Sequence, residues 1–239
     1  MTSSLLDELA DRVLPGAAPA GGWWILVVLV AGLVVVGVPA LWRPARLAVT
    51  IVHELGHAGI GILVGRRFTG FVVNGDMSGH AVTVGPRRGV GRVLSTWAGY
   101  PAPAVIGAVL LQIGLGGWSG TALTVVLLAL LLALPFVRSA HTLLTVLLTA
   151  LVVAVVWWWG GTSGTAGLCL GAGVLLLLGA WRHLGAVAVG GRRRDDPQQL
   201  AELTGVPAWV WVLSQLLVIA ACSWWALRVL APHVPLSLG

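Results

Sequence analysis

Residues 45–64 read ARLAVTIVHELGHAGIGILV, and this stretch decides how the rest of the chain is interpreted. It is apolar and, at about 1.5 Å of rise per residue, long enough to cross a bilayer as a helix. Within it, His53, Glu54 and His57 form the pattern H-E-x-x-H. Histidines at positions i and i+4 share one face of a helix, so both can bind one zinc ion, and the adjacent glutamate can act as a general base. Because ionisable residues are costly inside a membrane, this spacing predicts a functional site.

The composition of the whole chain is that of a membrane protein. Of its 239 residues, 58% are hydrophobic and only 9% are charged. We therefore expect an all-α polytopic membrane protein, in which residues 1–21 form a lead-in and residues 22–239 form a single transmembrane domain. The basic residues are all arginine and give a net charge of +6. They lie beside apolar runs and in no nucleic-acid-binding motif, so we expect no nucleic-acid partner.

Seven apolar runs approach the length of a membrane span, although the fourth and the sixth are short, so we expect six to seven transmembrane helices. The runs are 22–42, 45–64, 93–115, 121–137, 140–159, 165–181 and 206–230. With seven spans and a cytoplasmic N-terminus, only Arg43, Arg46 and Arg228 face outward, as the positive-inside rule favours. The arginine-only, Ala- and Leu-rich usage indicates a bacterial coding bias. We therefore expect a multi-pass protein of the bacterial cell membrane with an external C-terminus.

A short polar segment follows the H-E-x-x-H helix. Residues 68–84 read FTGFVVNGDMSGHAVTV and hold two β-prone runs around Asn74-Gly75-Asp76. Asn-Gly between such runs is a strong signal for a tight turn, so we expect a small β-hairpin here.

A third zinc ligand has to come from outside the motif, because a catalytic zinc usually takes three protein ligands and a water. The candidates on the expected cytoplasmic side are Asp76 and His80 in the hairpin, and His183, Asp195, Asp196 and Glu202 further along. Asp196 is favoured, because it precedes Pro197 where a helix begins. An Asp-Pro pair at this position is also an ordinary helix cap, so Asp195 and Asp76 stay open as ligands.

The motif and the hairpin resemble the site-2 proteases, which are intramembrane zinc metallopeptidases. Three further segments are similar to their compact bacterial branch, the M-fifty-B-like proteins: DMSGHAVT at 76–83, AGYPAP at 98–103 and DDPQQLAELTGVP at 195–207. The resemblance implies that His53 and His57 bind Zn²⁺, that Glu54 activates water and that Asp196 completes the site. The larger family places an Asn near the scissile carbonyl. Because the sole Asn here is Asn74, Tyr100 and His80 become the candidates for that role.

The leading hypothesis is an intramembrane zinc metalloendopeptidase that cleaves transmembrane or juxtamembrane segments of membrane proteins. A substrate helix must unwind first, because its backbone hydrogen bonds are satisfied internally, and the hairpin edge can receive the unwound strand. The alternative is a metal-binding membrane scaffold or transporter without peptidase activity. A transporter needs a polar path, whereas Gln112 and Gln215 are the main polar exceptions in these runs.

Overall fold

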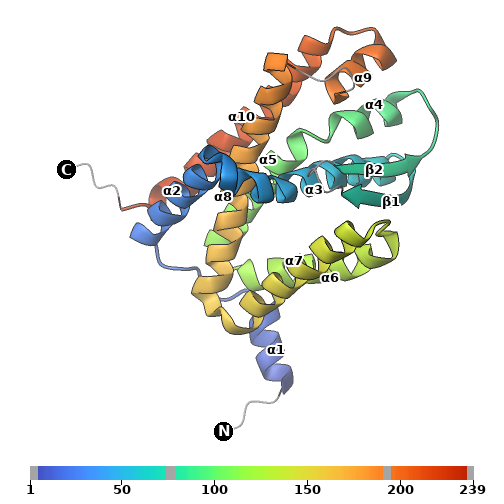
Figure 1. The fold of residues 1–239 in the computed structure, drawn as a ribbon. Coiled ribbons are helices and arrows are strands. Elements are labelled where there is room, and N and C mark those ends of the chain that lie inside the picture. Colours follow the sequence, from blue (N-terminus) through green and yellow to red (C-terminus); the bar gives the residue numbers. More distant parts are fainter. Residues whose placement is uncertain (1–4, 74–78, 191–194, 236–239) are drawn as a thin grey trace.

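A computed structural model describes residues 5–73, 79–190 and 195–235, and it is helical apart from one hairpin (Figure 1). The hairpin pairs β1 (Arg67–Val73) with β2 (Gly79–Val84) in antiparallel fashion. The helices are α1 (Leu5–Val13), α2 (Trp23–Gly37), α3 (Pro39–Leu63), α4 (Val90–Trp97), α5 (Pro101–Leu115), α6 (Ser119–Ala133), α7 (Ala140–Trp159), α8 (Gly161–Gly190), α9 (Asp196–Thr204) and α10 (Ala208–Leu230), with short 3-10 turns at Leu134–Phe136 and Ala231–His233. The predicted all-α membrane class with a small hairpin after the H-E-x-x-H helix is thereby confirmed.

The helices of the described residues provide four to six membrane spans. Four are long and apolar enough to cross a membrane, and the number reaches six if each of two bent pairs forms one span. The pairs are α2 with α3, bent by 101°, and α4 with α5, bent by 59°. The expectation of six to seven spans is therefore met at its lower value if each bent pair is one span, and the described residues show no seventh span.

The break between α2 and α3 falls at Val38, not in the predicted connection around Arg43. Val38 is extended, and Pro39 begins α3. Proline disfavours a helical residue before it and fits the first position of a helix, which explains this boundary. Helix α3 then continues through Pro44, so Arg43 and Arg46 lie inside it. The two arginines therefore lie within a helix and not in a connection between two spans.

The two ends of the apolar region lie together. The Gly22 N–H donates to the His233 carbonyl at 3.0 Å, and the Gly16 N–H donates to Gly117 at 2.9 Å. Arg12 of α1 donates to the Trp158 carbonyl and stacks over the Trp158 ring. Figure 1 shows α1 and the end of α10 far from the hairpin, α4 and α9. An even number of spans would place both termini on one side of the bilayer. The prediction that the termini lie on opposite sides depends on a seventh span.

Helix α5 forms the centre of the packing, against α8, α10 and α3. Where α5 meets α8, a Cβ on Gly107 would stand 2.7 Å from the Gly173 carbonyl oxygen, and one on Gly173 would stand 2.8 Å from the Gly107 oxygen. Small residues at such crossings let two membrane helices approach backbone to backbone. The buried side chains Ala104, Ala108 and Leu111 continue this contact. The start of α5, which borders the candidate site, is therefore held by a closely packed helix pair.

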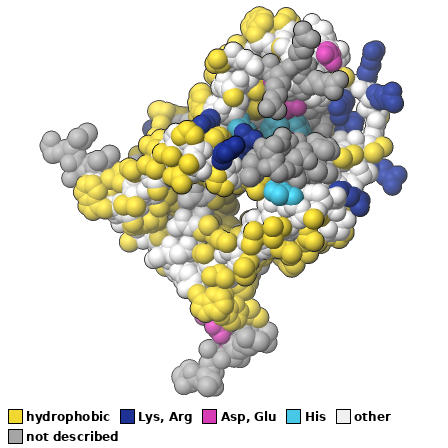
Figure 2. Space-filling view, in the orientation of Figure 1, with side chains coloured by type: hydrophobic (Ala, Val, Ile, Leu, Met, Phe, Trp, Pro, Cys, Tyr) yellow, Lys and Arg dark blue, Asp and Glu magenta, His cyan; other side chains and the backbone are white. Residues whose placement is uncertain are grey.

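The outer surface separates apolar from basic side chains. Figure 2 shows hydrophobic side chains over much of the visible surface, while most of the basic ones gather over the hairpin and the start of α4. Many large apolar side chains on α6 and α7 are exposed, among them Leu128, Leu132 and Leu151. Such a surface suits contact with lipid, since soluble proteins rarely expose large apolar patches.

Candidate metal centre

Helix α3 presents two histidines one turn apart. The Nε2 atoms of His53 and His57 stand 3.1 Å from each other, with the rings at right angles. Both side chains are largely buried, at 14% and 15% exposed. The i, i+4 spacing of the two histidines therefore brings one nitrogen of each ring to the same place, as expected from the sequence.

Helix α9 brings Asp196 to the same point. Its Oδ2 lies 3.2 Å from Nε2 of His53 and 3.2 Å from Nε2 of His57. Asp195, not Asp196, occupies the N-cap position, and it makes no side-chain capping bond. Asp196 is instead the first residue of α9, so its carboxylate points to the histidines and does not cap the helix.

The three atoms have the spacing of zinc ligands. Their separations of 3.1, 3.2 and 3.2 Å form a nearly equilateral triangle. Ligands about 2.0 Å from a tetrahedral zinc would stand roughly 3.3 Å apart. The buried Oδ2 of Asp196 makes no well-aligned hydrogen bond within the described residues. Two nitrogens and one carboxylate oxygen converge here as ligands would, and this donor set fits zinc. Among the described residues, no other group of three or more His, Cys, Asp or Glu side chains lies close enough together to hold a metal ion.

A backbone carbonyl sets the tautomer of His57. Its Nδ1 lies 2.7 Å from the Ser95 carbonyl oxygen, which only accepts, so Nδ1 carries the proton. In a neutral ring this leaves the lone pair on Nε2, the atom that faces His53 and Asp196. Ser95 also donates from Oγ to the His57 carbonyl at 2.9 Å. Ser95 of α4 thus fixes His57 from both directions, a role that the sequence motif did not reveal.

The segment between α4 and α5 forms one wall of the site. A Cβ on Gly99 would stand 2.4 Å from Cε1 of His57 and 2.7 Å from Cε1 of His53. On the facing helix, a Cβ on Gly56 would stand 2.5 Å from Cβ of Ala102. Glycine at both positions therefore lets α3 lie directly against this segment. The Tyr100 ring meets the His53 ring edge to face, with centroids 4.7 Å apart.

Charge at the site favours an ionised Asp196. Burial by itself raises the pKa of the Asp196 carboxyl, but the two adjacent histidines outweigh burial and hold that pKa well below its ordinary value. Metal ligands must be deprotonated, so a carboxyl group whose pKa is held low suits this position. Glu54 is also buried, at 8% exposed, and lies close enough to interact electrostatically with His57 and Tyr100.

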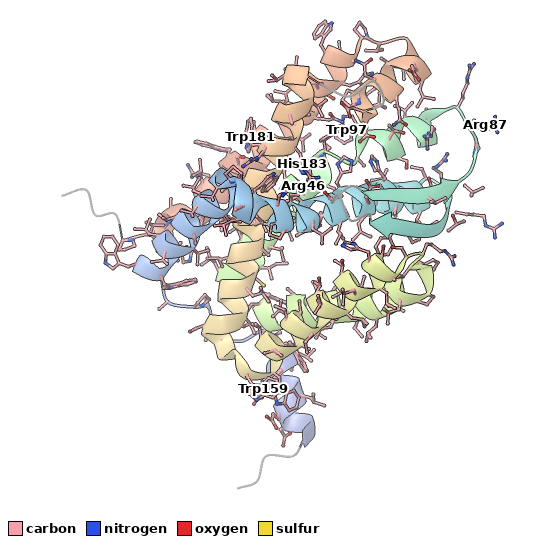
Figure 3. All side chains as sticks on the ribbon, in the orientation of Figure 1. Arg46, Arg87, Trp97, Trp159, Trp181 and His183 are labelled. Carbon is pink, nitrogen blue, oxygen red and sulfur yellow. The ribbon has the colours of Figure 1, made fainter. Side chains whose placement is uncertain are left out.

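None of the other ligand candidates whose side chains the structure describes joins this group. Asp76 lies outside the described residues, and so does the side chain of His80, whose backbone belongs to β2. His183 packs edge to face on Trp42, 5.7 Å between centroids, near Arg46 where α8 crosses α3 (Figure 3). Glu202 is exposed on α9.

A comparison with protein families gives one match: a family model described as Peptidase M50B-like, which covers residues 25–226. The matched region runs from α2 to α10 and contains the two histidines, Glu54 and Asp196. No curated protein and no solved structure matches the chain.

Proposed function

The chain belongs to the Peptidase M50B-like family, and from this premise we propose that it is an intramembrane zinc endopeptidase that cleaves transmembrane or juxtamembrane segments of membrane proteins. At the level of the family it is a membrane metallopeptidase of the site-2 protease type. The observation that carries the finer proposal is the convergence of His53, His57 and Asp196 beside the buried Glu54. Its partners would be a membrane-protein substrate and the lipid bilayer, in the bacterial cell membrane.

Three side chains would hold the metal. These are His53 through Nε2, His57 through Nε2 and Asp196 through Oδ2. A zinc ion bound there would polarise the scissile carbonyl and lower the pKa of a coordinated water. The Ser95 carbonyl keeps the His57 lone pair on the binding nitrogen, and Gly99 leaves room for both rings.

Glu54 would move the proton. It follows His53 directly on α3, and the group of potential ligands does not include it. As general base it would take a proton from the attacking water and pass it to the leaving amine. Tyr100, whose ring lies against His53, is the described candidate to donate a hydrogen bond to the scissile carbonyl.

The hairpin would receive the substrate. Strand β1 pairs with β2 on one side, and its Phe71 forms a bridge with Val137 on the other. The outer edge of β2 has no strand partner among the described residues, and Val82 and Val84 on this strand are exposed. An unwound substrate can add to such an edge as a further strand, which meets the need for backbone hydrogen bonds within the membrane.

The alternative, a metal-binding scaffold or transporter, has less support. A transporter needs polar side chains along a path through its spans. The fully buried Gln215 instead donates to the Trp97 carbonyl at 3.2 Å, where it ties α10 to α4. A metal scaffold also has no need of a buried carboxylate beside its ligands.

The decisive experiment separates proton transfer from metal binding. Glu54→Gln keeps size and hydrogen-bonding capacity but cannot act as a base. We expect it to retain zinc and to lose cleavage of a single-pass model substrate by roughly 10²- to 10⁴-fold. Glu202→Gln, which makes the same change at an exposed position on α9, should behave as wild type.

Two results would contradict the proposal. Cleavage at the wild-type rate by Glu54→Gln would refute the mechanism. Tight zinc binding by a wild-type protein that cleaves no membrane substrate would favour the scaffold.

A further inference from the structure

Three arginines surround a pocket where the hairpin joins α4. The pocket has a volume of about 350 Å³ and is lined by Arg66, Thr83, Val84, Gly85, Arg87 and Arg92. None of these described lining residues is acidic. Figure 3 shows Arg87 on the outer side of this connection, away from the helices.

Arg66 forms the floor of the pocket and is fixed in place. Its guanidinium donates to the Pro86 carbonyl at 2.8 Å and to Oγ1 and the carbonyl of Thr83 at 3.2 and 3.3 Å. All three acceptors are neutral, so these bonds hold the side chain without cancelling its charge. A Cβ on Gly85 would stand 3.2 Å from the guanidinium, so the residue after β2 is packed directly on it.

The second side of the pocket is also positive. Arg92 stands in the first turn of α4, and its charge is close enough to repel that of Arg66. The first turn of a helix adds unpaired N–H groups and the positive end of the helix dipole, and α4 has no side-chain cap among its described contacts. Like charges gathered around a cavity create a strongly positive potential, which favours an anionic ligand.

We propose that this pocket binds a phosphate group, carried either by an anionic lipid headgroup or by a soluble phosphate. Guanidinium groups match the geometry of phosphate oxygens in pairs, and an arginine cluster beside membrane spans attracts anionic lipids. The fixed Arg66 supplies a preorganised floor, while the exposed Arg87 can close over the ligand. This inference does not depend on peptidase activity.

A bound phosphate would brace the elements around the metal centre. Arg92 contacts Gln199 of α9 at 3.5 Å, and α9 begins with Asp196. On the same face of α4, one turn further on, Ser95 holds His57. The pocket therefore stands one helical turn from the contact that orients a candidate ligand.

The first test measures lipid selectivity. The full chain is placed in nanodiscs that contain both phosphatidylglycerol and phosphatidylcholine. Native mass spectrometry of the protein released from these nanodiscs should show more bound phosphatidylglycerol than phosphatidylcholine. Arg87→Gln and Arg92→Gln should each lower this preference about fivefold. Arg88→Gln is the matched control, because Arg88 is an exposed neighbour that does not line the pocket. An unchanged helical circular dichroism spectrum and a single size-exclusion peak would show that each variant is folded.

The second test identifies the source of the phosphate. Inorganic phosphate is titrated into delipidated protein in detergent, and its binding is followed by the rise in melting temperature. Selectivity for phosphatidylglycerol alone assigns the pocket to a lipid headgroup, and a phosphate response lost in Arg87→Gln assigns it to soluble phosphate. If Arg87→Gln and Arg92→Gln match Arg88→Gln in both tests, the proposal is wrong.

Discussion

Two glycines determine how much room the histidines have. Gly99 stands so close to His53 and His57 that a methyl group there would overlap both rings. Gly56 has the same relation to Ala102 from the opposite side. The histidine rings can therefore occupy their positions only because Gly99 and Gly56 have no side chains.

Gly99→Ala should weaken metal binding. The new methyl group must push at least one ring out of the 3.1–3.2 Å triangle. Changes that disturb ligand orientation typically lower metal affinity about 10- to 100-fold, and this range is expected in a competitive chelator titration. Gly59→Ala on α3, the helix that carries both histidines, is the control, because nothing lies within 4 Å of a Cβ there. Equal zinc affinity in the two variants would show that the rings do not need this space.

Sequence patterns predicted the local features of the site but did not determine which distant residue joins the two histidines. The i, i+4 spacing of His53 and His57 already placed them on one face of a helix, since helical geometry is local. The choice among Asp76, Asp195 and Asp196 depends on how α9 packs against α4 and α10, which brings Asp196 to the histidines of α3. That contact joins distant parts of the chain and has no local signature. The role of Gly99 was hidden for the same reason, because only the packed structure shows which atoms face it.

Among the helices, α9 has the most specific task. It has nine residues, begins at Asp196 and lies against α4 and α10. Asp195 supplies the backbone carbonyl that accepts from Gln198 and Gln199 at 3.0 Å. At the start of α9, Asp195 therefore occupies the N-cap position, while the next residue, Asp196, faces the histidines.

Asp196→Ala should lose zinc and activity together. Removing Oδ2 leaves only the two ring nitrogens, so zinc content should fall to that of His57→Ala. Asp195→Ala should keep its zinc, because Asp195 is not part of the group formed by His53, His57 and Asp196. Elemental analysis of the purified variants gives the answer directly. Zinc lost from Asp195→Ala and kept in Asp196→Ala would mean that the third ligand is wrongly assigned.

The bend between α2 and α3 shows where apolar patterning is insufficient. Both flanking segments are apolar, so hydropathy alone merged 22–42 into one span. Pro39 marked the boundary, because a residue before proline avoids the helical conformation. The hairpin was predicted correctly for the converse reason, since Asn74-Gly75 is a strong local turn signal between two β-prone runs.

In the molecule as a whole, several arginines gather at the end that holds the hairpin, away from α1 and from the end of α10 (Figure 1). Arg66, Arg87 and Arg92 surround the phosphate pocket, and Arg138 donates to Thr69 of the hairpin at 2.9 Å. The start of α2 lies at the opposite end from the hairpin (Figure 1), and Gly22 just before it is hydrogen-bonded to His233. With six spans, the positive-inside rule leads us to expect the arginine-rich end in the cytoplasm and both termini outside.

Topology reporters can test this arrangement. Fusions at Ser3 and Ser237 should both report the external side, and a fusion truncated after Arg138 should report the cytoplasm. A Ser3 fusion in the cytoplasm with an external Ser237 fusion would restore the seven-span arrangement. Two cytoplasmic termini would contradict both arrangements.

The close contact of α3 with the segment around Gly99 also has a pharmacological implication. Because Gly56 and Gly99 seat the two backbones against each other, the ring nitrogens are shielded from that side. Any chelating inhibitor must reach them from the other side. Bulk that extends past the rings toward Gly99 has no space there, so a compound that places bulk on this side should bind more weakly than one that does not.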